Sequence, residues 1–330
     1  MSQPPYFEFV VEKSLSGIRI DSFLGKHLRN YNTWRLQRIV AAGAVTINFA
    51  TAAQTDRVFR GQTVSIRLLE PPDKLLEPEA IPLEIVYEDN WIMVINKPAD
   101  LVVHPVGEIQ LETLANGLQH LLDQRTELKG ILRPGIVHRL DRQTSGAIVV
   151  AITHRSHAAL AAEFEASRVS KSYLALVEGN VQLDRGVIDR PIGRALQGRH
   201  VLMSCRPDAA KPRKTKTVYR VVERYEDYTL VLARPLTGRN HQIRVHLAHL
   251  GHSLVGDEFY LPNGKFKPFD TGRVPGDSRE IETGLPIKRH ALHAIQLEVT
   301  HPVSGLWMNF QAELPADFRE TIEVLRNSRT

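Results

Sequence analysis

The sequence predicts an α+β protein of two domains, a small one followed by a larger one. The chain has 330 residues, more than a single domain usually holds. A proline-rich segment over residues 69–83 divides it unevenly. In the longer part, strand-like runs mostly follow one another directly, so hairpins outnumber strand–helix–strand crossovers. This order predicts a mixed, largely antiparallel sheet flanked by helices, not a doubly wound fold.

Residues 17–68 are expected to form the small α/β domain, with residues 1–16 as an N-terminal extension. The run RIDSFLGKHLRN places its apolar residues on one helical stripe. A second helix is predicted from Thr33, as its N-cap, through Trp34 to Gly43. The runs AVTIN and TVSIRL alternate apolar and polar residues, which indicates two half-buried strands.

Four prolines lie between residues 69 and 83, where they block helix and strand and predict a stiff linker. Residues 84–330 then form the larger domain. Hairpins are predicted around Asp89 and between the runs KTVYRVVERY and YTLVLARPL. The run AIVVAI reads as a buried strand, residues 111–122 as a helix, and residues 262–284 as a long surface loop. Further helices are predicted in HAALAAEFEAS, in HQIRVHLAHLGH and after the last proline.

Charge is distributed unevenly along the chain. The sequence has 42 Lys and Arg against 37 Asp and Glu, a mild excess that permits a nucleic-acid partner without requiring one. Residues 185–220, however, hold ten basic and two acidic residues. Such a segment attracts a polyanion, although a solvated mobile loop would have the same composition.

The composition excludes several classes of protein. The single cysteine, Cys205, can form neither an internal disulfide nor a cysteine-rich zinc site, and this suits a reducing compartment. The apolar runs are far shorter than the ~20 residues that span a bilayer, and no secretory signal is visible. We therefore expect a cytoplasmic protein without a membrane partner.

No motif for a nucleotide triphosphate, a dinucleotide or a zinc protease is present. Four histidines, however, gather between residues 241 and 252, and His246 and His249 share a helical face. A metallohydrolase is therefore one alternative, but no carboxylate or cysteine joins these side chains, so we expect no bound metal.

The segment GIVHRLDRQTSGAIVV, residues 135–150, places a polar cluster between two apolar strand-like runs. Its carboxylate, Asp141, is costly to bury unless it is paired or functional. A functional site is one interpretation. The other is a structural Asp that bonds the following Thr-Ser turn or pairs with Arg139 or Arg142.

The run HRLDRQTSG resembles the signature His-Arg-Leu-Asp-x-x-Thr-Ser-Gly of the RluA-type pseudouridine synthases. Four other segments are similar to parts of the same family: INKPADLVVHP, KSYLALVEG, LTGRNHQIRVHLAHLGHSLVGD and RHALHAIQLEVTHPVSG. Two of them depart from the family pattern, with Asp100 in place of glycine and Asn240 in place of threonine. Residues 17–68 resemble the S-four-type RNA-binding domain, although the usual Asn-Gly turn after its strand is missing.

The resemblance implies that the protein isomerises selected uridines of RNA to pseudouridine, with the pseudouridine synthase fold and without a cofactor. It assigns the nucleophilic or charge-stabilising carboxylate to Asp141 and the arginine that pairs with it to Arg244. Tyr173 corresponds to the tyrosine that lies against the target base, and Arg139 to the arginine that fills the gap left by the flipped nucleotide.

The same resemblance implies other RNA contacts and a structural role for part of the signature. His138 and the Thr-Ser pair after Asp141 are expected to hold the loop that presents the carboxylate. Arg35 and Arg38 fall off the apolar stripe of the second helix and are candidate RNA contacts of the small domain, as is the basic segment 185–220. Ribosomal RNA is the expected partner more than transfer RNA, and we expect a monomer.

Each of these residues also has a structural interpretation. Tyr173 fits a core position on a strand, Arg139 an ordinary salt bridge, and Arg244 a phosphate contact or a charged helix surface. A catalytically silent RNA-binding or ribosome-assembly protein of the same fold is therefore the alternative function. The intact set of Asp141, Arg244 and Tyr173 argues against it, since a silent protein has no need of a buried charged pair.

Overall fold

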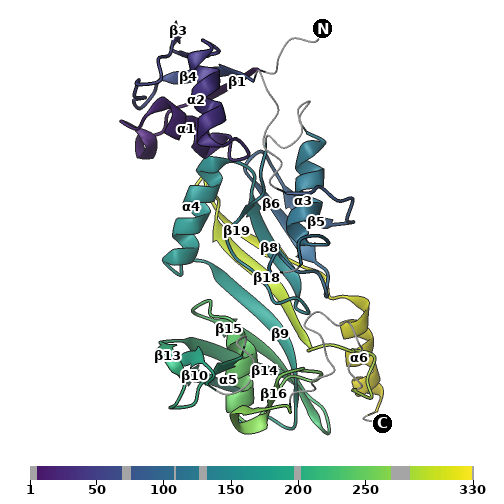
Figure 1. Ribbon diagram of the computed structural model, residues 1–330. Coiled ribbons are helices and arrows are strands. Elements are labelled where there is room, and N and C mark those ends of the chain that lie inside the picture. Colours follow the sequence, from purple (N-terminus) through teal and green to yellow (C-terminus); the bar gives the residue numbers. More distant parts are fainter. Residues whose placement is uncertain are drawn as a thin grey trace.

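The computed structural model describes residues 6–68, 76–107, 109–125, 132–196, 202–268 and 283–328. Figure 1 shows an elongated molecule with the small domain at one end and helix α5 near the other. The described strands include a four-stranded sheet in the small domain and a ten-stranded sheet in the larger one. The predicted class, a mixed and largely antiparallel sheet flanked by helices and preceded by a small domain, is confirmed.

The small domain packs two helices against an antiparallel sheet of order β1-β4-β2-β3. Its elements are β1 (Tyr6–Val10), α1 (Ile20–His27), α2 (Thr33–Ala41), β2 (Val45–Ile47), β3 (Ala50–Thr51) and β4 (Thr63–Arg67). The helical stripe predicted for α1 is buried against α2 and β4, with Ile20, Phe23 and Leu24 fully inaccessible. Residues 6–68 therefore have a hydrophobic core of their own.

Three details of the small domain differ from the prediction. Residues 6–10 are not part of an extension, because β1 pairs antiparallel with β4 and buries one face of its alternating sequence. The N-cap of α2 is Asn32, whose side chain accepts from the N–H of Arg35. Trp34 is 62% exposed and so does not belong to the buried apolar face; the guanidinium of Arg38 lies over its ring, 4.7 Å from the centroid.

The larger domain is built on the ten-stranded sheet, of order β10-β14-β15-β9-β18-β8-β6-β5, with β19 beside β18 and β7 beside β8. All its pairings are antiparallel except that of β18 with β8. Its strands are β5 (Glu84–Glu88), β6 (Ile92–Lys97), β7 (Gly135–Ile136), β8 (Ser145–Ala151), β9 (Ser170–Glu178), β10 (Arg185–Asp189), β14 (Lys216–Arg224), β15 (Tyr228–Pro235), β18 (Leu292–Thr300) and β19 (Trp307–Gln311). The helices are α3 (Leu114–Asp123), α4 (His154–Glu165), α5 (Gln242–His249) and α6 (Ala316–Asn327).

Strand β8 shows where the core lies. Its predicted apolar run is buried on both faces, as expected for a central strand. Ile148 and Val150 pack in the cluster that includes α3, whereas Ala147 and Val149 pack on the opposite face with Leu160 of α4. The sheet is thus covered on both sides at β8, and the polar segment 137–144 leads directly into this buried strand.

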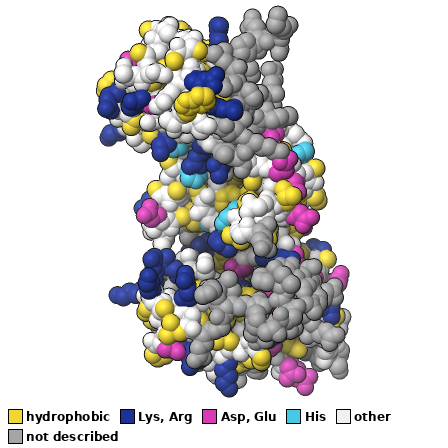
Figure 2. Space-filling model, in the orientation of Figure 1, with side chains coloured by type: hydrophobic (Ala, Val, Ile, Leu, Met, Phe, Trp, Pro, Cys, Tyr) yellow, Lys and Arg dark blue, Asp and Glu magenta, His cyan; other side chains and the backbone are white. Residues whose placement is uncertain are grey.

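The basic segment 185–220 is not simply a loop. It contains β10, the start of β14, and a three-stranded sheet of β11 (Ile192–Arg194), β12 (Met203–Ser204) and β13 (Ala210–Arg213). Figure 2 shows Lys and Arg side chains gathered in two places on this face, in the notch beneath the small domain and over the part that contains these strands. The segment therefore presents its charge from an ordered surface.

Two predicted loops lie partly outside the described residues. Of the predicted linker 69–83, residues 69–75 lie outside the described residues. Further along the same linker, Ile81 and Leu83 pack on the core of the larger domain next to α3. For the loop 262–284, residues 269–282 are outside, and residues 265–266 form β17 (Lys265–Phe266), which pairs with β16 (Tyr260–Leu261). In the described part of the chain, no helix combines the length and the apolar character needed to cross a membrane.

Candidate active site

The segment HRLDRQTSG forms a loop between β7 and β8, which we call the catalytic loop (residues 137–144). It turns back on itself, because the N–H of Thr144 donates to the carbonyl of Asp141 at 3.0 Å. The Nε2 atom of His138 accepts from the N–H of Val149 at 3.0 Å, and its ring stacks on Phe164 of α4. Burial lowers the pKa of His138 to about 3, so the ring is neutral and can accept this bond.

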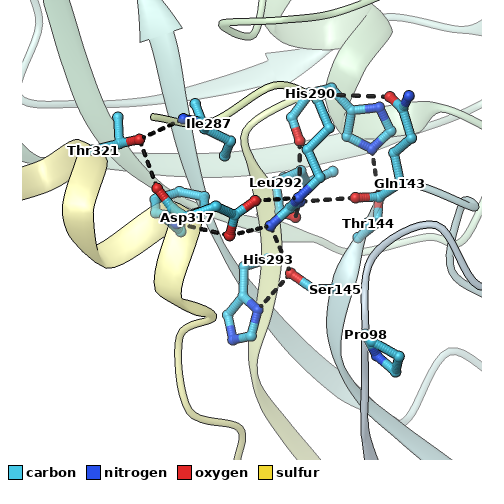
Figure 3. A network of polar contacts seen from close by, with 12 residues as sticks. Pro98, Gln143, Thr144, Ser145, Ile287, His290, Leu292, His293, Asp317 and Thr321 are labelled. Atoms are coloured by element: carbon cyan, nitrogen blue, oxygen red, sulfur yellow. Dashed lines mark hydrogen bonds and ion pairs between the residues drawn. The ribbon is translucent and has the colours of Figure 1, made fainter. Parts of the chain in front are cut away.

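The C-terminal part of the chain supports the far end of the loop (Figure 3). Arg289, just before β18, donates from Nη1 to the carbonyl of Gln143 at 2.8 Å. Its guanidinium also meets both carboxylate oxygens of Asp317 on α6, at 2.8 and 3.2 Å. Arg289 is buried, whereas Asp317 is 33% exposed, so only the arginine side of this ion pair is shielded from water. Helix α6 thereby fixes the arginine that holds the catalytic loop.

Two histidines beside Arg289 bind the hydroxyls of the signature. His290 Nε2 lies 2.8 Å from Thr144 Oγ1, and His293 Nδ1 lies 2.9 Å from Ser145 Oγ. Burial lowers the pKa of both rings, that of His293 to about 4, so both are neutral at neutral pH. The Thr-Ser pair thus anchors the loop, in the structural role that the resemblance implies for it.

Lys97, at the end of β6, supports the loop from the other side. Its side chain is fully buried and donates to the carbonyls of Pro98, Leu101 and Arg142, at 2.6, 2.9 and 3.1 Å. Burial and the nearby Arg289 lower its pKa to about 7. The lysine of the INKP segment therefore joins two separate stretches of chain beneath Asp141.

The glycine of the signature is required by the close approach of two strands. Gly146 has a φ of 115°, and a Cβ atom built on it would lie 2.3 Å from the carbonyl oxygen of Ala294. Only glycine lets β8 run parallel against β18 at this point. The catalytic loop ends two residues before Gly146, at Thr144, so this contact fixes the position of its end.

Asp141 is held by a charged pair that spans the domain. Nη1 of Arg244, on α5, donates to Asp141 Oδ2 at 3.2 Å. The Nε and Nη2 atoms of the same guanidinium donate to the two oxygens of Asp257, both at 2.8 Å. Arg244 is 2% exposed and Asp257 1%, so one buried cation lies between two carboxylates. Its orientation is fixed by Asp257 and directed at Asp141.

These neighbours keep Asp141 ionised. Burial by itself would raise the pKa of Asp141, but the charge of Arg244 and the hydrogen bond from it bring that pKa below its usual value. His241 is itself neutral at neutral pH, since burial and Arg244 lower its pKa to about 4. Arg244 is therefore the charge that acts on Asp141, and Asp257 helps to raise the pKa of Arg244 against its burial.

His241 closes the site at the N-terminus of α5, in a left-handed backbone conformation with a φ of 54°. Its Nε2 atom lies 4.0 Å from Asp141 Oδ2. Its Nδ1 atom is 2.7 Å from the hydroxyl of Tyr260, and its ring is nearly parallel to that of Phe259. The ring is thus locked beside the carboxylate.

Asp141 faces a small cavity of about 80 Å³ between the catalytic loop, β9 and α5. Tyr173 on β9 lines it and is 8% exposed, and burial and the charge of Asp141 raise the pKa of its hydroxyl. Arg139, Lys171 and Arg244 supply cations to the same lining. The structure therefore brings four of the predicted residues together: Asp141, Arg244, Tyr173 and Arg139.

The other two predicted residues lie elsewhere. Arg35 and Arg38 are on α2 of the small domain and do not line this cavity. The histidine cluster also divides: His241 faces Asp141, whereas His246 is bound on both ring nitrogens by Thr217 and Thr215, at 2.8 and 3.0 Å. Within the described residues, no three histidine, cysteine or acidic side chains are placed to hold a metal ion.

Sequence reasoning missed Asp257, His241 and Lys171 as parts of the site. Asp257 ends the matched segment LVGD, and His241 and Lys171 also fall in segments that resemble the family. Their positions in the sequence were visible, but their function depends on contacts 13 to 103 residues apart. No local pattern carries that information.

The arrangement suits chemistry at a sugar or a base. An ionised, oriented carboxylate at the wall of a small cavity can attack an electrophilic carbon or stabilise a developing positive charge. The ring of Tyr173 offers a flat apolar surface to a base, and the surrounding cations attract a polyanionic substrate.

Comparisons with known proteins agree with this geometry. The model of the RNA pseudouridylate synthase family matches residues 91–249. The chain is 35% identical over 327 residues to a ribosomal large subunit pseudouridine synthase D of Zymomonas mobilis, covering 97% of this chain and 98% of that one. It is 37% identical over 322 residues to the protein of the same name from Nitrosomonas europaea, covering 97% and 88%.

A solved structure gives the same result for the fold. Human RNA pseudouridylate synthase domain containing 4 superposes with a TM-score of 0.56 and 25% identity, over 74% of this chain and 93% of that one. Full-length similarity to named synthases, the matching fold and the pairing of Asp141 with Arg244 are consistent with one another. The chain belongs to the RluA-type family of RNA pseudouridine synthases.

Proposed function

We propose that this enzyme converts uridines of large-subunit ribosomal RNA to pseudouridine, and that Asp141 is its catalytic carboxylate. The names of the relatives support the choice of RNA. The observation that carries the role of Asp141 is its bond to the buried Arg244 at the wall of a cavity that Tyr173 also lines. No observation favours a silent binding protein, because a charged pair of this kind is costly to bury and serves no evident purpose in binding.

The reaction conserves all the heavy atoms of the uridine. The bond between N1 of uracil and C1′ of ribose breaks, the base rotates, and a new bond forms from C5 to C1′. The proton on C5 is lost to solvent, and N1 gains one. No electron passes to an outside acceptor, so the balance requires no co-substrate. The protein must supply an oriented carboxylate, a place for the detached base and exclusion of water.

Each role falls to a residue of the cavity. Asp141, ionised and aimed by Arg244, acts on the sugar or the base. Tyr173 stacks on the uracil and keeps it in place while it turns. Arg139, exposed at the mouth of the cavity, occupies the space that the flipped nucleotide leaves in the RNA. The small volume of the cavity implies that the uridine reaches Asp141 only after it has left its stack.

We further propose that residues 6–68 act as an S-four-type RNA-binding domain, with Arg35 and Arg38 as contacts, and that the basic segment 185–220 binds the RNA backbone. Both arginines lie on α2, one turn apart and next to the exposed Trp34. A cation beside an exposed aromatic ring is a common combination in RNA-binding surfaces. Because ribosomal RNA is the substrate, we place the enzyme in the cytoplasm, and we retain the prediction that it is a monomer.

A tritium-release assay tests this function. Transcribed large-subunit ribosomal RNA with tritium at uridine C5 is incubated with the wild type and with Asp141→Asn, and tritium in water is counted. Asp141→Asn keeps the side-chain shape, and Asp257 still neutralises Arg244, so the variant should fold, as a thermal melt would show. We expect release by the wild type alone. No release by the wild type would overturn the function, and equal release by both would overturn the role of Asp141.

A further inference from the structure

A second, larger hollow separates the small domain from the larger one. This interdomain cleft has a volume of about 1080 Å³, more than ten times that of the cavity at Asp141. The end of α1 and Arg29 form one wall; the other includes His104, Arg133, Ile136, Arg139 and His157. Figure 2 shows Lys, Arg and His side chains gathered in the notch at this place. Of the residues singled out in the sequence analysis, Arg139 and His138 line it.

The cleft carries positive charge that no ion pair among the described residues neutralises. Arg29 and Arg133 face it from opposite domains, and neither forms an ion pair within the part of the chain that the structure describes. Glu77 is the one acidic residue among the described lining residues. Burial and the charge of Arg133 lower the pKa of Arg29, which is the effect of two cations brought together in a place of reduced solvation.

Two histidines in the wall respond to the same positive charge. Burial and the charge of Arg139 lower the pKa of His104, and burial and the charge of Arg29 lower that of His157. Both rings are therefore neutral at neutral pH and are free to accept or donate hydrogen bonds. Three arginines and two neutral histidines in one cleft form a lining that suits phosphate groups and the hydroxyls of ribose.

The cleft leads directly to the catalytic carboxylate. Arg139 lines both the interdomain cleft and the cavity at Asp141, so the two hollows meet at this side chain. A neighbouring hollow of about 600 Å³ shares Arg29, Arg133 and His157 with the cleft and adds Lys26 and Arg155. Basic residues thus continue between the domains in this hollow, where they outnumber the two acidic lining residues, Glu8 and Glu12. A chain-like anion can occupy this whole path, whereas a small anion would use only one part of it.

We propose that the interdomain cleft binds the phosphate backbone of the RNA strand that carries the target uridine, with Arg29 and Arg133 as phosphate contacts from the two domains. This inference rests on the proposed function, because it takes RNA as the substrate. The strand runs from the small domain through the cleft, past Arg139, to the cavity at Asp141. Contacts from both walls would also fix the angle between the domains when RNA is bound.

The proposal is tested by the salt dependence of binding. Wild type, Arg29→Gln, Arg133→Gln and the double variant bind an unmodified transcript of large-subunit ribosomal RNA between about 0.05 and 0.5 M KCl. The control is Arg319→Gln, which removes the same charge from an exposed position on α6 that lines none of these hollows. Each contact with a phosphate adds about 0.7–0.9 to the slope of log Kd against log salt. We expect each single variant to lose that amount and the double variant about 1.4–1.8.

If the binding curves of wild type and variants converge near 1 M salt, these slopes predict the Kd at about 0.15 M salt. Each single variant should then have a roughly 4- to 6-fold higher Kd than the wild type, and the double variant one that is about 15- to 30-fold higher. The single-turnover rate at saturating enzyme should stay unchanged, since neither arginine lines the cavity at Asp141. The Tm should not fall either, because each substitution removes an unneutralised cation. Slopes equal to that of Arg319→Gln would overturn the proposal, and so would a lower saturating rate with unchanged Kd.

The outcomes also separate this inference from the proposed function. If the wild type releases tritium and the double variant binds as the wild type does, the cleft is not an RNA path but the function stands. If the wild type releases no tritium and the double variant still loses salt-dependent affinity, the cleft binds RNA and the proposed function fails. A protein partner in the cleft would leave RNA binding unchanged and so counts against the proposal.

Discussion

Asp257→Asn should disturb the orientation of Arg244, and so lower the rate of the reaction, without changing the affinity for RNA. In the wild type, both oxygens of Asp257 accept from Arg244 at 2.8 Å, and the third nitrogen of the guanidinium donates to Asp141. The substitution keeps the shape of the side chain but turns one acceptor into a donor that faces Arg244. The guanidinium must then shift, and the buried cation keeps only one carboxylate.

The size of the effect follows from the burial of the pair. Breaking a buried ion pair by removing one partner costs about 3–5 kcal/mol. For a domain of this size, that lowers Tm by roughly 6–20 °C. Misdirecting the charge-assisted bond to Asp141 costs a further ~1.5–3 kcal/mol in the transition state, which is about 10- to 150-fold in kcat. Asp257 does not line the cavity, so the Kd for RNA should stay within about twofold.

The assay is single-turnover tritium release at saturating enzyme, with RNA binding and thermal melts measured in parallel. The control is Asp21→Asn in the small domain, where a 4% exposed carboxylate accepts from Arg19 at 3.1 and 3.0 Å. It should lower Tm without changing the saturating rate. A variant Asp257→Asn with a wild-type rate, or with a loss that Asp21→Asn shares, would refute the reasoning.

Four further predictions concern the site and its support. Tyr173→Leu should lower activity about 5- to 150-fold, because the stacking surface for the base is lost. Tyr173→Phe keeps the ring and should lose less activity than Tyr173→Leu; a larger loss for Tyr173→Phe would assign the main role to the hydroxyl. The single-turnover rate should show no acid limb until the pH falls below the usual carboxyl pKa, because the pKa of Asp141 is lowered; a limb near pH 6 would contradict this. The buried rings of His246 and His293 have pKa values of about 4, so below about pH 6.5 the unfolded chain binds more protons than the folded one. By about pH 5, each histidine should therefore lower the free energy of unfolding by about 2 kcal/mol, which a falling Tm would show. Gly146→Ala should destabilise the protein by about 3 kcal/mol or more, whereas Gly17→Ala, with a φ of 87° but open space around it, should cost only about 1 kcal/mol in the same denaturant titration.

Much of the fold could be predicted because its elements carry local signals. The run AIVVAI is apolar on both sides of the strand and is buried on both faces in β8. The hairpin at Asp89 is present between β5 and β6 because its carboxylate caps the turn, accepting from the N–H groups of Trp91 and Ile92. Strand β1 was missed because its few alternating residues are stabilised by β4, more than fifty residues later in the chain.

The candidate site was predictable only in part, for a related reason. The signature around Asp141 is local and specific, and the residues named with it meet in one cavity. The carboxylate that orients Arg244 could not be found by pattern, since Asp257 acts through a guanidinium on another element. The interdomain cleft was also invisible, because Arg29 and Arg133 are ordinary basic residues until two domains bring them together.

The support of the catalytic loop by Arg289, His290 and Asp317 has a consequence for biosynthesis. The loop is made near the middle of the chain, but the side chains that hold it follow about 140 to 180 residues later. A nascent chain that has not yet produced β18 and α6 therefore has the signature without its geometry. The enzyme becomes competent only after β18 and α6 have been made, and a product truncated before residue 289 would carry every residue of the signature yet remain inactive.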